Sequence, residues 1–195
     1  MTKSELRKKY IEKRKTLSQD EVLSLSEKIF DNFLGKFHLV KGQKVHCFLS
    51  MLEKKEVDTR FFLDYFFKKG IRVFVPKIFK GKLISIEITL ETAFIKSFYG
   101  ITEPESNLDS GENNFDYVIT PLLYCDKKGN RVGYGKGYYD QFFESINSDS
   151  VKIGIGLFAP EEDVDDFWEK DVRLNYLVTP LEILSFGDGV SKFTK

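Results

Sequence analysis

The sequence predicts an α/β fold: a single three-layer domain over residues 1–195, with a largely parallel sheet and helices on both of its faces. Short apolar runs typical of buried strands alternate with longer segments typical of helices, which is the pattern of a parallel sheet with crossover helices. A chain of 195 residues, 42% of them hydrophobic, can also bury one continuous core. Strands are expected at 44–50, 71–75 (closed by Pro76), 115–120, 151–157 and 175–179, with an edge or hairpin strand at 83–88.

Four segments carry the composition or the end signals of helices. In the first, Leu6, Tyr10 and Ile11 form a thin apolar stripe, and the basic residues Lys3, Arg7 and Arg14 without further context favour a solvated basic helix. Ser18 and Glu21 have the spacing of a capping box that starts the second helix. The helices are expected at residues 3–16, from Ser18 to near Gly35, from about Thr59 to Lys69, and after Gly137.

Composition argues against some classes of function. Lys+Arg and Asp+Glu are equal at 30 each, and a formal net charge of zero argues against bulk electrostatic binding to nucleic acid or to an anionic membrane. No apolar run is long enough to span a membrane and the charged start is not a secretory signal, so a cytoplasmic protein is expected. Cys47 and Cys125 lie in apolar runs, which favours buried structural thiols over catalysis or metal binding.

A glycine-rich loop carries the clearest chemical signal. After an apolar run that stops at Pro121 and a polar turn, glycines occupy alternate positions 133, 135 and 137, with Arg131 and Lys136 beside them. Alternating glycines can adopt positive φ angles and bring backbone N–H groups close to a ligand. Because the loop leads into an expected helix, unpaired N–H donors and the positive end of the helix dipole would also face an anion. The residues therefore predict a phosphate-binding loop.

The residues alone leave a plainer interpretation of this loop open. A loop rich in Gly and Tyr is often only a mobile surface turn. The sequence lacks the Gly-Lys-Ser/Thr ending of a Walker loop, and Tyr138 stands where the dinucleotide fingerprint has its third glycine. Generic nucleotide motifs therefore do not identify the loop.

The string from Asp126 to Asp140, D-x-x-G-x-R-x-G-Y-G-x-G-Y-Y-D, resembles the signature of 5-formyltetrahydrofolate cyclo-ligases, also called 5,10-methenyltetrahydrofolate synthetases. Further elements resemble this family in the same order: a K-x-x-L-R opening at Lys3, then Leu49, Glu56 and Thr59 after the first strand, an aromatic-G-I-x-E-P element at 98–104, and a closing element from Asp171 to Thr179. Two segments depart from the family, since the loop before Glu56 is longer and Phe158 precedes Ala-Pro where the family has Phe-x-x-Gln.

The resemblance implies an enzyme that uses ATP to convert 5-formyltetrahydrofolate into 5,10-methenyltetrahydrofolate, with release of ADP and phosphate, by phosphorylating the formyl oxygen. Positioning and charge neutralisation carry phosphoryl transfer, which suits a site of Arg, Lys, glycine N–H groups and Mg²⁺. The expected partners are the small molecules ATP and 5-formyltetrahydrofolate, with Mg²⁺ as cofactor, no nucleic acid and no membrane. A monomer is expected. With His38 and His46 as the two histidines, no Ser-His-Asp triad is evident.

The resemblance also implies roles for individual residues. Lys136 and Arg131 are the expected catalytic groups. Lys3, Arg7 and Arg14 fall near one side of the first helix, and the first two would reach the phosphates of ATP. The full set expected to bind ATP is Lys3, Arg7, Arg131, Gly133, Tyr134, Gly135, Lys136, Gly137, Tyr138 and Tyr139. The folate would be bound by Leu49, Glu56, Tyr99, Tyr134 and Tyr138, and the metal by Asp140 and Asp171.

Several of these residues also have structural interpretations. Glu56 could pair with the amino-pyrimidine edge of a pterin, or it could be an exposed loop carboxylate. Tyr99 could stack on a flat ring of the folate or belong to the core. Asp140 could hold magnesium or stabilise the dipole of the helix that it begins, and Asp171 could be structural.

Two other classes of function are to be distinguished from the cyclo-ligase. A non-catalytic nucleotide- or RNA-binding regulator on the same fold would keep the glycine loop and lose the folate pocket. A sugar-phosphate isomerase or CoA-transferase relative would share this type of sheet, and fold analogy alone cannot separate it. The presence of Leu49, Glu56 and the 98–104 element beside the glycine loop favours the cyclo-ligase over both.

Overall fold

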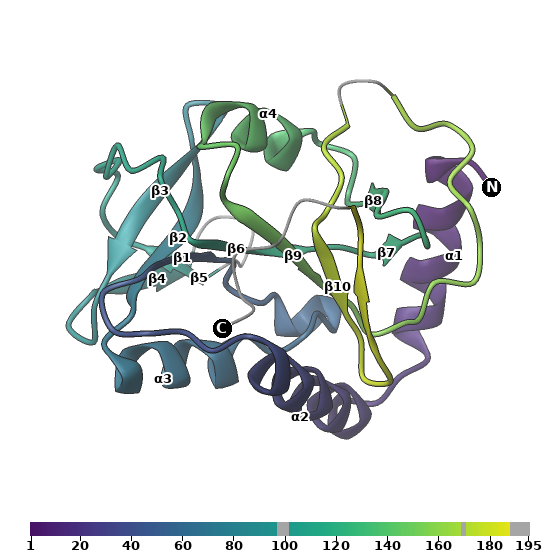
Figure 1. The fold of residues 1–195 in the computed structure, drawn as a ribbon, viewed down its shortest axis with the longest axis horizontal. Helices are drawn as coiled ribbons and strands as arrows, with labels where there is room; N and C mark the ends of the chain where they lie inside the picture. The colour runs from purple at the N-terminus through teal and green to yellow at the C-terminus, as the bar shows by residue number, and fades with distance from the viewer. Residues whose placement is uncertain (97–101, 169–170, 188–195) are drawn as a thin grey trace.

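A seven-stranded mixed sheet forms the centre of the molecule (Figure 1). The computed structural model describes residues 1–96, 102–168 and 171–187. The strand order is β11-β10-β9-β6-β1-β2-β3; the inner strands run parallel, and β3 and β11 pair antiparallel at the two edges. The strands are β1 (Lys44–Cys47), β2 (Arg72–Phe79), β3 (Lys82–Ile88), β6 (Tyr117–Pro121), β9 (Val151–Ile155), β10 (Tyr176–Val178) and β11 (Ile183–Ser185). The predicted α/β fold with a largely parallel sheet is confirmed.

Helices cover both faces of this sheet, as predicted (Figure 1). They are α1 (Lys3–Lys15), α2 (Gln19–Lys36), α3 (Arg60–Lys69) and α4 (Tyr138–Ser145). α2 and α3 pack on one face, where Val45 and Cys47 of β1 join their core, whereas His46 points to the other face and contacts Phe142 of α4 with ring centroids 4.4 Å apart. This alternation is the period-two pattern of a strand buried on both sides. Within the described ranges, no helix is both long enough and apolar enough to cross a membrane.

Two short hairpins accompany the sheet. β4 (Phe94–Lys96) pairs with β5 (Thr102–Pro104), and β7 (Tyr124–Cys125) pairs with β8 (Arg131–Val132). The β7–β8 hairpin follows β6 and lies beside α1 (Figure 1). It therefore brings the start of the glycine loop next to the first helix of the chain.

The first helix is docked onto the protein through its apolar stripe. Leu6 and Tyr10 are fully buried, and the Tyr10 ring stacks on Tyr124 of β7 with centroids 4.3 Å apart. Thr2 and Glu5 start the helix with a capping box that the sequence analysis did not anticipate, in which Thr2 N donates to Glu5 Oε2 at 2.8 Å and Glu5 N donates to Thr2 Oγ1 at 3.3 Å. The interpretation of this segment as a solvated basic helix is therefore wrong.

The ends of α2 and α3 follow the predicted signals. Ser18 N donates to Glu21 Oε2 at 2.6 Å and Glu21 N donates to Ser18 Oγ at 3.1 Å, so the capping box is confirmed. α2 ends at Lys36, directly after the predicted stop at Gly35. α3 is closed by Gly70 in the left-handed conformation, with φ of 67°.

Two predicted strand ends are wrong by three residues or more. β1 ends at Cys47, three residues before the predicted end at 50, and a loop follows. β2 continues through Pro76 to Phe79, because β1 pairs with β2 only as far as Phe74 and Pro76 lies beyond that pairing, opposite Ser85 of β3. The missing N–H of Pro76 therefore breaks no hydrogen bond to β1.

Both cysteines lie in the interior as free thiols. Cys47 and Cys125 are fully buried, and burial raises the pKa of each thiol above its ordinary value. Because the thiolate is the reactive form, neither group is primed for nucleophilic chemistry. The structural interpretation is confirmed.

Candidate active site

The turn between β7 and β8 is fixed by one buried carboxylate. Oδ1 of the fully buried Asp126 accepts hydrogen bonds from the backbone N–H groups of Lys128 (2.9 Å) and Asn130 (2.8 Å). Oδ2 of Asp126 accepts from Asn130 Nδ2 (2.7 Å) and from the backbone N–H of Val164 (3.2 Å). Four donors offset the cost of burying the acid. The turn therefore holds Arg131, the first residue of β8, in a defined position.

Arg131 lies against the first turn of α4. Its Nη2 donates to Asp140 Oδ1 at 2.8 Å, and its side chain is only 9% exposed. The guanidinium carbon lies 5.5 Å from the ring centroid of Tyr139 and 5.9 Å from that of Phe143. The structure thus brings together a predicted catalytic residue and a predicted metal ligand, and it pairs them with each other.

The glycine loop leads directly into α4, as predicted. Gly135 (φ 84°) and Gly137 (φ 71°) adopt the left-handed conformation, which residues with a Cβ rarely do. Gly137 is the N-cap of α4, and no side chain in the described part of the chain caps the helix there. The N–H groups of the first turn are therefore left for another acceptor, such as an anion.

Basic side chains reach this loop from two directions. Arg7 of α1 donates from Nε to the carbonyl oxygen of Gly133 at 2.9 Å. A Cβ at Gly135 would lie 3.1 Å from the Arg7 guanidinium carbon, so a larger residue there would push against the Arg7 side chain. Lys136 is exposed and makes no ion pair or hydrogen bond to any residue that the structure describes. Arg7 is therefore held against the loop, whereas Lys136 at the tip of the loop is available to a ligand.

The loop after β1 turns Glu56 toward the interior. The short 3₁₀ helix η1 (Leu52–Lys54) and the left-handed Lys55 (φ 50°) reverse the chain, and Glu56 is only 3% exposed. Its Oε2 accepts from the backbone N–H of Met51 and its Oε1 from the Tyr134 hydroxyl, both at 2.9 Å. Burial raises the pKa of the Glu56 carboxyl above its ordinary value. The interpretation of Glu56 as an exposed loop carboxylate is therefore wrong.

Tyr134 is where the glycine loop and the Glu56 loop meet. Besides donating to Glu56, its hydroxyl accepts from Nη1 of Arg14 at 3.2 Å. Arg14 is 4% exposed, and its Nη2 donates to the carbonyl oxygen of Leu122 at 2.8 Å. Arg14 has no predicted role in the site; the signal that the sequence offers is its spacing of seven residues from Arg7, two turns along the same side of α1.

The two predicted metal ligands lie in separate ion pairs. Asp140 pairs with Arg131, and Oδ2 of Asp171 pairs with Lys3 Nζ and accepts from the backbone N–H of Trp168 at 2.5 Å. The described residues contain no cluster of three or more His, Cys, Asp or Glu that could hold a metal by itself. A magnesium ion that arrives on a nucleotide needs only one or two carboxylates. The 34% exposed Asp140 side chain beside the glycine loop fits that lesser requirement.

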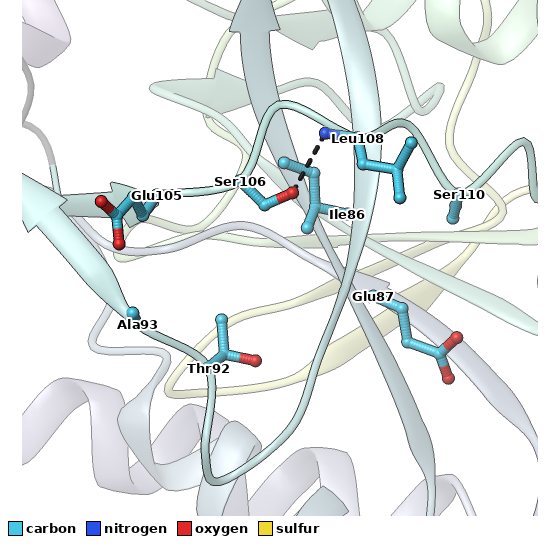
Figure 2. Close-up of a pocket in the computed structure, with 8 residues that line it drawn as sticks. All are labelled: Ile86, Glu87, Thr92, Ala93, Glu105, Ser106, Leu108 and Ser110. Carbon is cyan, nitrogen blue, oxygen red and sulfur yellow. Dashed lines mark hydrogen bonds between the residues drawn. The ribbon is translucent and has the colours of Figure 1, made fainter.

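A large cavity lies away from the glycine loop. It has a volume of about 680 Å³ and is lined by β3, the segment before β4 and residues 105–110, including Ile86, Glu87, Glu105 and Leu108 (Figure 2). A second cavity of about 230 Å³ lies between β3 and α4. The lining of the larger cavity includes the carboxylates of Glu87 and Glu105, and Glu87 is paired with Arg72 at 2.7 Å.

His46 is a core residue with no catalytic geometry. Its ring is fully buried, and neither ring nitrogen has a hydrogen-bond partner among the described residues. Burial lowers the pKa of His46 to about 3, so the imidazole is neutral at physiological pH.

Comparison with known proteins decides the family. The sequence profile of the 5-formyltetrahydrofolate cyclo-ligase family matches residues 1–180. The chain belongs to this family.

Similar cyclo-ligases support the assignment along almost the whole chain. The 5-formyltetrahydrofolate cyclo-ligase of Mycoplasma pneumoniae is 27% identical over 179 residues, which cover 91% of this chain and 98% of that protein. The NMR structure of Aquifex aeolicus 5,10-methenyltetrahydrofolate synthetase covers 100% of this chain and 97% of its own, with a TM-score of 0.76 and 28% identity. The structure of the M. pneumoniae 5,10-methenyltetrahydrofolate synthetase covers 92% of this chain and 99% of its own, with a TM-score of 0.71 and 26% identity.

The structure gathers most of the residues that the cyclo-ligase resemblance singled out. Arg7, the glycine loop, Arg131, Asp140 and Glu56 are joined by α1, the β7–β8 hairpin and the start of α4. Leu49 is half-buried after β1 and packs on the main core. Tyr99 lies in the segment 97–101, outside the described residues.

Proposed function

We propose that this protein is a 5-formyltetrahydrofolate cyclo-ligase, which uses ATP to convert 5-formyltetrahydrofolate into 5,10-methenyltetrahydrofolate with release of ADP and phosphate. The observation that carries the proposal is the Tyr134–Glu56 hydrogen bond, which joins the glycine loop to the carboxylate that follows β1. The glycine loop, which we propose binds phosphate, and a buried hydrogen-bond acceptor meet there, in a chain that matches the family over residues 1–180. A reaction between ATP and a folate needs both features at one place.

The chemistry requires both substrates to be held together. The formyl oxygen attacks the γ-phosphorus of ATP, an oxygen–phosphorus bond forms, and ADP leaves with the electron pair of the broken bond. The 10-nitrogen of the folate then attacks the activated formyl carbon and loses its proton, and phosphate departs with the electrons of the carbon–oxygen bond. Positioning and neutralisation of charge carry such a reaction, and no covalent intermediate with the protein is needed.

The basic residues and the glycine loop are proposed to bind ATP. Lys136 would neutralise the transferred phosphoryl group from the tip of the loop, and Arg131 would do so from β8. The N–H groups at the start of α4 would face the phosphates, and Arg7 and Lys3 would add charge from α1. The wider proposed ATP set is Lys3, Arg7, Arg131, Gly133, Tyr134, Gly135, Lys136, Gly137, Tyr138 and Tyr139.

The folate is proposed to bind on the Glu56 side of Tyr134. The Glu56 carboxylate would accept hydrogen bonds from the amino-pyrimidine edge of the pterin, because an ionised carboxylate has acceptor sites beyond those that Met51 and Tyr134 occupy. The proposed folate set is Leu49, Glu56, Tyr99, Tyr134 and Tyr138. Aromatic rings among these residues suit the flat rings of a folate.

Magnesium is proposed to accompany the nucleotide, with Asp140 and Asp171 as its protein ligands. Held by these carboxylates, the ion would neutralise negative charge on the phosphates of ATP. Asp140 Oδ1 is paired with Arg131, and its second oxygen would face the metal. We further propose that the protein acts as a monomeric, single-domain cytoplasmic enzyme.

A single assay tests the function. The purified protein is mixed with 5-formyltetrahydrofolate, Mg²⁺ and either ATP, a non-hydrolysable ATP analogue or no nucleotide, while the absorbance of methenyltetrahydrofolate and the released phosphate are followed. We expect methenyltetrahydrofolate only in the mixture that contains ATP, with one phosphate released for each methenyl group formed. ATP binding without product would instead support the non-catalytic nucleotide-binding regulator.

A further inference from the structure

Arg14 is a buried cation next to a buried carboxylate. It is 4% exposed and Glu56 is 3% exposed, and the Tyr134 hydroxyl lies between them, 3.2 Å from Arg14 Nη1 and 2.9 Å from Glu56 Oε1. The guanidinium is anchored by its bond to the Leu122 carbonyl oxygen at 2.8 Å. None of the residues proposed above to bind ATP, folate or metal supplies this buried positive charge beside Glu56.

The direction of the hydrogen bonds follows from the chemistry of the three groups. A guanidinium only donates, so the Tyr134 oxygen must accept from Arg14. The single hydroxyl proton of Tyr134 is then left to point at Glu56. A carboxylate that receives a donor on each oxygen keeps unoccupied lone pairs with a fixed orientation. An ionised Glu56 can only accept as well, so Arg14 and Glu56 both require this direction of the hydroxyl, and Arg14 holds the Tyr134 oxygen that contacts Glu56.

The groups facing Glu56 do not act equally on its charge. Burial raises the pKa of Glu56, and Met51 N–H, the Tyr134 hydroxyl, Arg14 and Lys54 lower it. Lys54 is exposed on η1, where water screens its charge, whereas Arg14 is buried. Tyr139 of α4 also lies within electrostatic range of Glu56 and is neutral. Arg14 is therefore the main buried charge that favours the ionised form.

We propose that Arg14 is a positioning residue, which acts through the Tyr134 hydroxyl to keep Glu56 ionised and oriented as the acceptor for the folate. The inference rests on the proposed function, because it assumes that Glu56 binds the pterin edge. Donor groups of the pterin need an acceptor, and a protonated carboxyl would present a donor to them instead. Without Arg14, burial would raise the pKa of Glu56 further, and the carboxyl would take up a proton more readily as the pH falls.

The test measures the dissociation constant of 5-formyltetrahydrofolate by calorimetry from pH 6 to pH 8.5. Arg14→Met removes the charge at similar length, Arg14→Lys keeps it, and Lys8→Met removes an exposed charge from the same helix as a matched control. For Arg14→Met we expect affinity at least about tenfold weaker than wild type at pH 6.5, recovering as the pH rises to 8.5. Arg14→Lys should lie between the two, and Lys8→Met should follow the wild type. ATP affinity should change less than twofold in all three.

The pH profile separates this role from a purely structural one. If Arg14 only fixed α1 to Leu122, its loss would weaken folate binding equally at every pH, and that result would overturn the proposal. An unchanged affinity would overturn it as well. Should Arg14→Met not fold, Arg14→Gln carries the test, because it also removes the charge, keeps a donor for the Leu122 carbonyl oxygen, and predicts the same recovery at high pH. Failure of the wild-type protein to form methenyltetrahydrofolate would refute the proposed function, whereas a flat Arg14→Met profile in an active enzyme refutes this inference alone.

Discussion

Arg131 and Asp140 form an ion pair of 2.8 Å across the entrance to α4, with the Arg131 side chain nearly buried and that of Asp140 one-third exposed. The pair places a positive group and a negative group side by side at the point where the glycine loop becomes a helix. A nucleotide with its metal carries the complementary charges, phosphate for Arg131 and cation for Asp140. Lys136, two residues before the helix, is the neighbouring cation that this pair leaves free.

Lys136→Ala tests the role of that free cation. Lys136 is exposed, so its removal should leave the free energy of unfolding within about 0.5 kcal/mol of wild type. If it neutralises the transferred phosphoryl group, kcat should fall about 100-fold, because a charged group aimed at the transition state is lost. The affinity for 5-formyltetrahydrofolate should stay the same. Steady-state kinetics at saturating ATP measure the effect.

Lys127→Ala is the matched control, since Lys127 is an exposed lysine in the turn before the glycine loop. Its kcat should equal that of the wild type. A wild-type kcat for Lys136→Ala at saturating ATP would show that Lys136 is not part of the catalytic machinery.

Most of the fold was predictable because it depends on local pattern. Apolar runs of strand length and the Ser18–Glu21 capping box are read from neighbouring residues, and both signals proved correct. The end of β2 was not predictable from Pro76 alone. A proline ends a strand only where the neighbouring strand needs its missing N–H, and β1 is too short to pair with β2 at Pro76. The Thr2–Glu5 capping box has the same spacing as Ser18–Glu21, so it too depends only on neighbouring residues.

The candidate site was predictable where a motif is contiguous and not where it depends on distant contacts. The glycine loop and its entry into α4 follow from adjacent residues. The burial of Glu56 depends on a hydrogen bond to Tyr134, 78 residues away, and on a left-handed Lys55, a conformation for which lysine has no preference. Arg14 was missed for the same reason, since its partner Tyr134 is 120 residues away.

Tyr139→Phe should leave the protein as stable as the wild type or stabilise it by up to about 1 kcal/mol. The Tyr139 hydroxyl is buried and has no hydrogen-bond partner among the described residues, and an unpaired buried polar group costs free energy. Tyr10→Phe is the matched comparison, because the Tyr10 hydroxyl donates to Glu162 Oε2 at 2.6 Å. Its loss should destabilise the protein by about 1–2 kcal/mol.

Urea unfolding of both variants and the wild type measures the difference. The order of stability should be Tyr139→Phe at or above wild type, and Tyr10→Phe below it. If Tyr139→Phe were the more destabilised variant, the Tyr139 hydroxyl would have a hydrogen-bond partner that the fold does not account for. The proposed place of Tyr139 in the ATP set would then need revision.

Removal of Asp140 or of Asp171 should change the magnesium requirement to different degrees. Asp140→Asn should raise the Mg²⁺ concentration for half-maximal activity, and high Mg²⁺ should partly restore turnover because water can replace the lost ligand. Asp171 is engaged by Lys3 and by the N–H of Trp168, so we expect a smaller increase for Asp171→Asn. Initial rates over a Mg²⁺ titration at fixed ATP give both values.

Asp64→Asn, an exposed carboxylate on α3, serves as the control and should give the wild-type titration. A wild-type curve for Asp171→Asn would leave Asp171 as a structural residue that holds Lys3. A wild-type curve for Asp140→Asn would remove the proposed metal site at the start of α4.

His46 should make the stability of the protein depend on pH. Burial lowers the pKa of His46 to about 3 in the folded state, well below the ordinary value of 6.5. Below pH 6.5 the unfolded chain therefore binds a proton that the folded protein does not, and stability is lost as the pH falls. The contribution to the free energy of unfolding should drop by about 2 kcal/mol between pH 7.5 and pH 5. His46→Phe, which suits a site lined by Phe115 and Phe142, should remove this part of the loss.

The comparison of pH 7.5 with pH 5 by urea unfolding isolates the effect, because all other titrating groups contribute equally to the wild type and to His46→Phe. His38→Gln is the control: His38 is exposed, so the variant should lose as much stability as the wild type. If the wild type and His46→Phe lost the same stability, His46 would be able to take up a proton in the folded state. That outcome would require a hydrogen-bond acceptor or water beside its ring, in place of the apolar surroundings under α4.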